Sequence, residues 1–193
     1  MSHKGSFEQL RFEHRRQAYK DYIKQISEFG YEYNEILENS STFIGHMSLL
    51  RQITLYELYK KSEGISGHIA DVGVFKGASA FLFSKLVRIF EPESLVQVHG
   101  FDWFKGWGKD SIETPIEEGS YRESEETIRN LINLQDLQSI LLLHNLDLTK
   151  DLHDFLKKSP HLMFKLIFLD VGFYNILSKS IPLFWKRLTP GGI

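Results

Sequence analysis

The chain has 193 residues, which is long enough to bury a substantial hydrophobic core in one domain, with or without an appended segment. Its 23 Lys and Arg residues are nearly balanced by 25 Asp and Glu residues, and the net charge of −2 provides no positive field that would attract nucleic acid or anionic lipid. The absence of cysteine excludes disulfides, thiolate catalysis and cysteine-ligated metal clusters.

The composition also bears on where the protein works. No apolar run approaches the roughly 20 residues that a helix needs to cross a bilayer, and the first residues lack the apolar core of a signal peptide. With 42% hydrophobic and 25% charged residues, the chain has the composition of an ordinary globular protein. We therefore expect a cytoplasmic protein with no membrane and no nucleic-acid partner.

The N-terminal third predicts helices. In residues 7–29 apolar side chains recur at helical spacing among charged ones, until a glycine ends the pattern. Residues 31–41 are polar and irregular, and the helical pattern resumes over 42–61. We predict residues 1–62 as a helical extension and 63–193 as a separate domain. The apolar stripe of the first helix would pack on that domain, contact a second copy of the chain in a homo-oligomer, or help to cover a substrate.

A strand, a glycine-containing turn and a helix start follow one another in residues 68–80, which read HIADVGVFKGASA. The strand contains Asp71, the turn contains Gly73 and Gly77, and the helix begins near Ser79. Glycines let the backbone turn sharply and let a ligand approach main-chain atoms, and the first N–H groups of a helix attract polar ligand atoms. The glycine spacing differs from that of dinucleotide-binding enzymes and of phosphate-binding loops. A tight structural turn is the alternative interpretation.

A second apolar strand, in residues 95–102, ends in Asp102. This acid lies about one strand–helix unit after the glycines, where doubly wound folds place a carboxylate that accepts hydrogen bonds from a ribose. The polar stretch that follows contains Trp103 and Trp107 and runs to Tyr121. A loop of about 20 residues is long for a compact domain and is typical of lids or binding loops. The tryptophans would stack on a base or a sugar, or form a hydrophobic plug that anchors the loop.

Two further strands end in polar residues. Residues 140–144 read ILLLH and are followed closely by Asp147, and the nearly continuous apolar strand at 164–169 ends in Asp170. Ligands of open α/β sheets lie at the carboxyl ends of the strands, so these polar residues are candidates for a site. His144 is either a catalytic base there or a structural residue with its hydrogen bonds satisfied.

The order of these segments predicts an α/β protein with a doubly wound, mostly parallel sheet. The motif DVGVFKGASA, the strand that continues into GFDWFKGW, and the later LDVGFYN and LFWKRLTPGG resemble class I S-adenosylmethionine-dependent methyltransferases. Within that class they are similar to the macrocin O-methyltransferase-like group, which modifies sugars of natural products. The resemblance covers residues 67–193 and implies a Rossmann-like fold. It also implies S-adenosylmethionine as cofactor and a small-molecule acceptor, either a sugar or another natural-product hydroxyl.

The resemblance implies roles for individual residues. Gly73 and Gly77 would contact the methionine end of the cofactor, with Asp71 ordering their loop. The other implied cofactor contacts are Ser79 at the helix start, Asp102 on the ribose, Trp103 beside it, Asp147 near the adenine, and Arg51 facing the methionine carboxylate from a preceding helix. Arg51 is alternatively an exposed side chain that only solvates its helix.

The acceptor side of the site depends on Asp170. The resemblance implies that this acid acts as a base near the acceptor hydroxyl or as a ligand of Mg²⁺, with His144 as the rival base. The macrocin-like group reads D-x-D-x-Y here, whereas this chain has Gly172 in place of the second acid and keeps Tyr174. A divalent cation on a single protein carboxylate would be weakly held.

The end of the sequence leaves the fold and the function partly open. Residues 190–192, PGG, lead into an expected fifth strand, and the sequence stops at Ile193. In the resembled family that strand ends in two acids and more strands follow, so we expect C-terminal strands to be missing from this chain. Two alternatives to a methyltransferase stay open. One is an NAD-dependent oxidoreductase or epimerase, and the other is a noncatalytic interaction module of the same fold.

Overall fold

The computed structural model describes residues 6–106 and 119–193, of which residues 6–16 are described as backbone only. Trp107 therefore lies outside the described residues. The chain divides into two compact units, Met1–Ile53 and Thr54–Ile193. The division expected between residues 62 and 63 stays a prediction.

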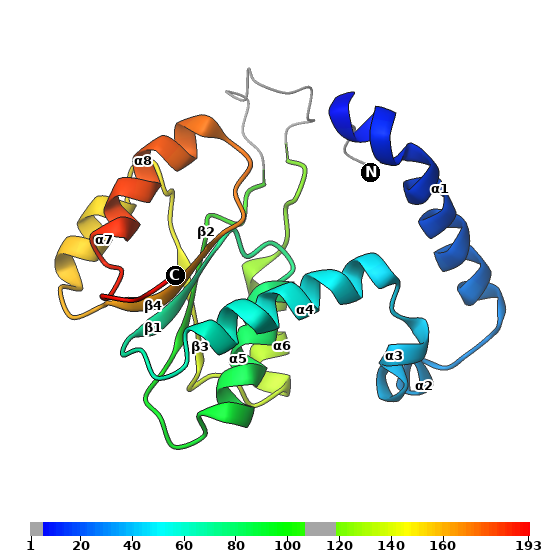
Figure 1. Cartoon of the computed structure of the whole chain (residues 1–193), viewed down its shortest axis with the longest axis horizontal. Helices are drawn as coiled ribbons and strands as arrows, with labels where there is room; N and C mark the ends of the chain where they lie inside the picture. The colour runs from blue at the N-terminus through cyan, green and yellow to red at the C-terminus, as the bar shows by residue number, and fades with distance from the viewer. Residues whose placement is uncertain (1–5, 107–118) are drawn as a thin grey trace. The chain divides into compact units, whose positions relative to one another are not determined.

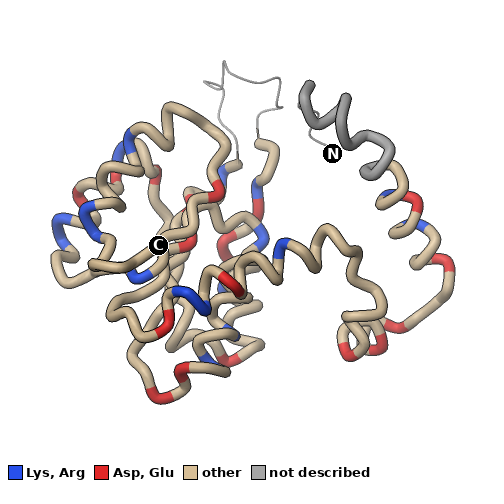
Figure 2. Tube along the Cα trace, in the orientation of Figure 1, with Lys and Arg blue, Asp and Glu red and all other residues tan. Residues whose placement is uncertain are grey.

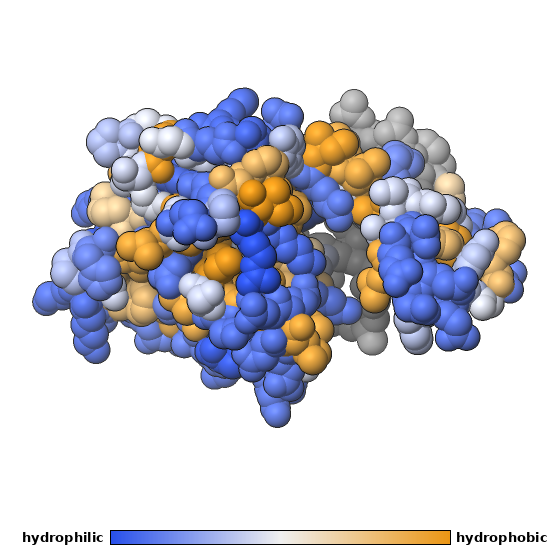
Figure 3. Space-filling view, turned by 90° about the horizontal axis from the view of Figure 1, so that it is seen from below, coloured by the Kyte–Doolittle hydropathy of each residue, from blue (hydrophilic) through white to orange (hydrophobic). Residues whose placement is uncertain are grey.

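The N-terminal unit is built from helices. They are α1 (Ser6–Glu28), α2 (Tyr33–Glu38), α3 (Ser40–Phe43) and the first half of α4 (His46–Lys61). Neither α2 nor α3 contains a buried residue. Hydrophobic side chains lie at the surface among hydrophilic ones (Figure 3). The described part of this unit therefore has little apolar core of its own.

Two details of these helices differ from the sequence-based prediction. The irregular structure predicted for residues 31–41 is wrong, because the Glu35 carboxylate accepts the N–H of Glu32 at 2.9 Å and caps the start of α2. The continuous helix predicted for 42–61 is also wrong. It is interrupted between α3 and α4, where Gly45 packs against the ring of Tyr19.

The second unit contains a four-stranded parallel sheet (Figure 1). Its strands are β1 (His68–Val72), β2 (Val98–Asp102), β3 (Leu141–Asn145) and β4 (Phe164–Leu169), arranged in the order β3-β2-β1-β4. The chain proceeds from β1 outward to β2 and β3, and then returns to place β4 on the other side of β1. The order thus reverses between β1 and β4, the place where open α/β sheets bind ligands.

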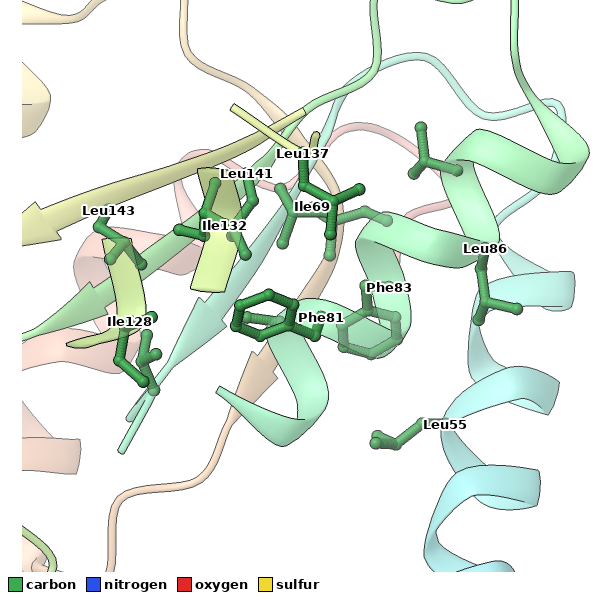
Figure 4. Close-up of a cluster of buried hydrophobic side chains, with 14 of the residues drawn as sticks. Leu55, Ile69, Phe81, Phe83, Leu86, Ile128, Ile132, Leu137, Leu141 and Leu143 are labelled. Carbon is green, nitrogen blue, oxygen red and sulfur yellow. The ribbon is translucent and has the colours of Figure 1, made fainter. Parts of the chain in front are cut away.

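Helices cover both faces of this sheet (Figure 1). The end of α4, α5 (Ala78–Phe90) and α6 (Glu125–Leu134) pack on one face, and α7 (Leu152–Lys158) and α8 (Tyr174–Trp185) pack on the other. On the first face, Phe81 and Phe83 of α5 lie with Ile69 of β1 and Ile132 of α6 in one cluster (Figure 4). Burying each such side chain contributes about 1.5–3 kcal/mol. The predicted doubly wound, parallel α/β fold is confirmed.

A charged side chain is buried between these layers. Lys165 on β4 has no exposed surface, and its Nζ lies 2.6 Å from Oε1 of Glu91 at the end of α5. The hydroxyl of Tyr59 on α4 donates to the same carboxylate oxygen at 2.6 Å. Burial, and then the hydrogen bond and charge of Glu91, raise the pKa of Tyr59. One carboxylate thus joins α4, α5 and β4 at the amino ends of the strands.

The last residues run along the outer edge of β4. Ile193 donates its N–H to the Lys165 carbonyl at 3.0 Å, and its carbonyl accepts the N–H of Ile167 at 2.8 Å. This alternation of hydrogen bonds is that of a parallel strand. Ile193 therefore occupies the place that the sequence predicts for the start of a fifth strand.

The described residues show a mixed charge distribution and no membrane-spanning helix. Lys and Arg residues are interspersed with Asp and Glu residues along the trace (Figure 2). Within residues 6–106 and 119–193, no helix combines the length and the apolar character needed to span a membrane.

Candidate functional site

The loop after β1 is fixed by a buried carboxylate. Asp71 has no exposed surface, and its two carboxylate oxygens lie 3.0 and 2.9 Å from the hydroxyl of Ser79 in the first turn of α5. Gly77 precedes that turn in the left-handed region at φ 83°, where a Cβ would lie 2.8 Å from the ring of Phe81. Only glycine avoids both the backbone strain and this contact. Asp71 thus connects the end of β1 to the start of α5 through hydrogen bonds with Ser79.

Gly73 is the point where three strands meet. It lies directly after β1 at φ 98°, and its N–H donates to the carbonyl of Phe101 on β2 at 2.9 Å. On its other side, a Cβ would lie 2.5 Å from the carbonyl oxygen of Asp170, which follows β4. The N–H of Asp170 in turn donates to the Val72 carbonyl at 2.8 Å. A side chain at position 73 would therefore force the ends of β1 and β4 apart.

Asp102 joins the loop after β1 to the loop after β2. Its Oδ2 accepts the N–H of Phe75 at 2.9 Å, and its Oδ1 accepts the N–H of Phe104 at 2.8 Å. Each carboxylate oxygen has two lone pairs, so each keeps one acceptor position besides its backbone partner. Asp71, Gly73 and Asp102, which the sequence singles out separately, therefore lie at one end of the sheet.

Aromatic side chains border this end of the sheet. The ring of Phe75 meets the ring of Tyr121 edge to face, with 5.4 Å between their centroids, and Lys76 Nζ lies 5.6 Å from the Phe75 centroid. Trp103, which follows Asp102, is half-buried. The sequence indicates aromatic contacts through the tryptophans but misses Phe75, because nothing in its local pattern shows that its N–H and its ring both point into this region.

Asp170 is the exposed acid beside the glycine turn. It follows β4, and the next residues lead through Gly172 to Tyr174, which starts α8 and is 73% exposed. The expected Mg²⁺ is not supported. In the part of the chain that the structure describes, no three His, Asp or Glu side chains are arranged to hold a metal ion.

Asp147 is engaged in its own turn after β3. Its Oδ1 accepts hydrogen bonds from the N–H and the hydroxyl of Thr149, at 2.8 and 2.7 Å, and its Oδ2 lies 3.1 Å from Lys150 Nζ. Partial burial raises the pKa of Asp147, but the bonds from Thr149 and Lys150 outweigh this effect and hold the pKa below its ordinary value. The local geometry explains the acid without a ligand, and its contact with an adenine stays a prediction.

His144 belongs to a row of histidines on the α7 and α8 face of the sheet. Its Nε2 lies 2.8 Å from Nδ1 of His99 on β2, and its ring lies against Phe101 and Phe155. His68 on β1 meets His99 edge to face at 5.1 Å. Burial and the charge of Arg129 lower the pKa of His144 to about 4. A ring nitrogen that is already hydrogen-bonded within the core favours the structural interpretation of His144 over that of a base.

His99 is the most deeply buried member of this row, with 5% of its surface exposed. Burial, and then the neighbouring His144, His68 and His161, lower its pKa to about 3. Its Nε2 has no hydrogen-bond partner among the described residues. The sequence gives no sign of this cluster, because the three histidines come from three separate strands.

The remaining candidate residue is Arg51, and the second unit also contains a cavity. Arg51 is an exposed residue of α4 in the N-terminal unit, and its contact with a cofactor stays a prediction. A cavity of about 350 Å³ lies at the amino ends of the strands, between the end of α5 and the residues that precede β2 and β3. We assign function to the carboxyl ends instead, because open α/β sheets bind ligands there and the glycines and acids converge there.

The solved structures that share this fold include two of CalS11 and one of NovP. The first is a crystal structure of CalS11, calicheamicin methyltransferase, with a TM-score of 0.80 and 17% identity over 99% of this chain and 77% of that chain. The second is the apo structure of CalS11, described as a TDP-rhamnose 3′-O-methyltransferase of calicheamicin biosynthesis, with a TM-score of 0.72 and 19% identity over 99% and 78% of the two chains. The third is the O-methyltransferase NovP, with a TM-score of 0.57 and 18% identity over 72% and 62%.

No family model and no curated protein sequence matches the chain. At identities below 20% the structural neighbours establish the fold, and the fold is the Rossmann-like α/β fold of these methyltransferase structures. The resemblance to class I methyltransferases that the motifs around Gly73, Asp102 and Asp170 indicate is thereby confirmed at the level of the fold.

Proposed function

We propose that the chain binds S-adenosylmethionine and transfers its methyl group to a hydroxyl of a small molecule, with a sugar as the leading acceptor class. The observation that carries this proposal is the convergence of Asp71, Gly73 and Asp102 at the carboxyl ends of adjacent strands. The structural neighbours include two proteins described as O-methyltransferases: CalS11, a TDP-rhamnose 3′-O-methyltransferase, and NovP.

The residues at this site fit a nucleoside that carries an amino-acid end. The acceptor positions left on the two oxygens of Asp102 suit the two hydroxyls of a ribose. Gly73 and Gly77 have left-handed backbones, which turn the loop between β1 and α5 where the methionine end would approach. The half-exposed ring of Phe75 offers an apolar wall beside them.

When bound, S-adenosylmethionine supplies a methyl group on a positively charged sulfur. The cofactor would give this methyl group to the acceptor oxygen and would keep the electron pair of the carbon–sulfur bond on sulfur. The hydroxyl proton must then leave the acceptor, and we assign it to the carboxylate of Asp170, an exposed residue whose backbone carbonyl lies against Gly73. Orientation of the acceptor in line with the methyl group supplies most of the remaining rate enhancement.

Titration calorimetry with S-adenosylhomocysteine, the demethylated product, tests the cofactor assignment. We expect the wild-type chain to bind it and not to bind NAD⁺. Gly73→Ala should weaken the affinity at least about tenfold, because the added Cβ meets the Asp170 carbonyl at 2.5 Å and separates β1 from β4.

Gly64→Ala is the matched control. Gly64 also has a left-handed backbone, at φ 75°, but no atom lies within 4 Å of its added Cβ. This variant carries similar backbone strain without the steric contact and should keep the wild-type affinity. Wild-type binding of NAD⁺ instead of S-adenosylhomocysteine would favour the oxidoreductase alternative.

A noncatalytic module of the same fold is the second candidate. It is favoured by Gly172, which stands where the resembled group has a second acid. This alternative expects cofactor or product binding without turnover. Mass spectrometry of a sugar and nucleotide-sugar panel incubated with S-adenosylmethionine separates the two, because only the enzyme adds a methyl group to an acceptor.

A further inference from the structure

Three bulky residues with left-handed backbones border the candidate site. Phe75 has φ 48°, Phe104 has φ 56° and Tyr121 has φ 58°. This conformation is unfavourable for a residue with a large side chain, and it persists only where the surroundings impose it. The fourth such residue among those described, Asp136, follows α6, where a left-handed residue commonly ends a helix.

The carboxylate of Asp102 explains the left-handed backbones of two of these three residues. Asp102 accepts the N–H of Phe75 at 2.9 Å through one oxygen and the N–H of Phe104 at 2.8 Å through the other. Charge-assisted bonds of this kind are among the stronger hydrogen bonds in proteins. The third residue, Tyr121, is linked to the same group through its edge-to-face contact with the Phe75 ring.

The side chains of the two bonded residues have different surroundings. Phe104 is 8% exposed and packs in the core on the α5 face, so its loop is anchored in the interior. Phe75 is half-exposed and lies between Gly73 and Gly77. Asp102 thus ties the glycine turn to Phe104, whose own position is fixed by packing. Neither an uncharged amide nor a protonated acid can do this equally well, because each turns one of the two acceptors into a donor facing an N–H.

We infer that Asp102 is a positioning residue, which holds residues 73–77 after β1 and residues 103–106 after β2 in the ligand-binding conformation before any ligand arrives. Asp102 fixes the Phe75 backbone through the hydrogen bond to its N–H. The position of the backbone in turn fixes the Phe75 ring, which contacts Tyr121. This role adds to a contact with ribose, and the nature of the ligand rests on the proposed function. The conformation of the two loops in the ligand-free protein does not rest on it.

Amide hydrogen exchange, followed by NMR on the ligand-free protein, tests the inference. In the wild type the N–H groups of Phe75 and Phe104 should be protected. In Asp102→Asn at least one of them should exchange ten times faster or more, and in Asp102→Ala both should. Amides inside β1, such as that of Ala70, should keep their exchange rates, which separates loop release from general destabilisation.

Asp136→Asn is the control, because Asp136 is a left-handed aspartate with an 81% exposed side chain. It should leave the Phe75 and Phe104 rates unchanged. The inference is overturned if these two amides stay equally protected in Asp102→Asn and Asp102→Ala. It is also overturned if they accelerate only together with Ala70.

The same variants are then titrated with S-adenosylhomocysteine. Weaker binding with unchanged exchange would mean that Asp102 acts by ligand contact alone, and this result also overturns the inference. Faster exchange in the variants, together with no binding by the wild type, would support the positioning role while refuting the proposed function.

Discussion

The two units of the chain differ in how they bury apolar surface. In the unit Thr54–Ile193, two hydrophobic clusters sandwich a parallel sheet, and Phe83 and Ile69 are fully buried. In the helices of the N-terminal unit, large apolar side chains remain exposed, among them Ile23 of α1 at 51% and Leu37 of α2 at 75%. A helical pattern in the sequence therefore predicts that a helix forms, but it does not predict whether the apolar side of that helix is covered.

The two units also differ in what holds their helices in place. The sheet unit contains both apolar clusters and the candidate site. The described N-terminal helices depend on a few hydrogen bonds, such as Tyr22 to the Phe43 carbonyl at 2.6 Å. A homo-oligomer formed through these helices, or a role for them in covering the substrate, stays a prediction.

The largest effect is expected for Phe83→Ala. This fully buried side chain packs between α5 and the sheet, so its truncation should lower the free energy of unfolding by about 3–5 kcal/mol. Leu37→Ala, on the 75% exposed position of α2, is the matched control and should change it by less than about 0.5 kcal/mol. Urea denaturation measures both. A large loss in Leu37→Ala would show that this surface is covered in solution.

The next largest effect should be a pH dependence of the free energy of unfolding, which arises from two histidines of the sheet unit. The pKa values of His99 and His144 lie at about 3 and about 4 in the folded chain. Unfolded histidines titrate near pH 6.5, so below that pH the unfolded state binds more protons and stability falls as pH falls. The contribution is complete above about pH 6.5, and each histidine removes up to about 1.4 kcal/mol per pH unit below it.

Urea denaturation between pH 7 and 5 measures this slope. The groups that face the pair are His68 and His161, which oppose protonation of His99, and Arg129, which opposes it at His144. Replacing both members by leucine should flatten the profile, because two apolar partners need no hydrogen bond. An unchanged slope in the double variant would assign the pH dependence to other groups.

The smallest effect is expected for Tyr22→Phe, which tests whether the two units unfold together. The variant loses only the hydroxyl that donates to the Phe43 carbonyl. If the N-terminal helices unfold together with the sheet unit, stability should fall by about 0.5–1.5 kcal/mol. Tyr33→Phe, at an 86% exposed position, is the control and should have no effect. No loss in Tyr22→Phe would mean that the N-terminal unit opens separately, before the global transition.

Much of the sheet unit could be predicted from local sequence. The strand at Phe164–Leu169 has the bounds that its apolar pattern indicates, and the helix at Ala78–Phe90 begins next to the predicted Ser79, because these features follow from local sequence. The glycines of the turn at 73 and 77 are also explained locally, since both have left-handed backbones. The helix at Tyr33–Glu38 was missed, because the bond between Glu32 and Glu35 outweighs its weak apolar pattern.

The sequence by itself determined the alternation of strands and helices, the turn with its two glycines, and the acids that follow the strands, because each of these depends on residues close together in the chain. Only the tertiary structure decided that Asp102 binds the N–H of Phe75, that Glu91 neutralises Lys165, and that His144 faces His99. These contacts join residues 27 to 74 positions apart, and they exist only because the pairing of the parallel strands and the packing of α5 on the sheet bring these residues together.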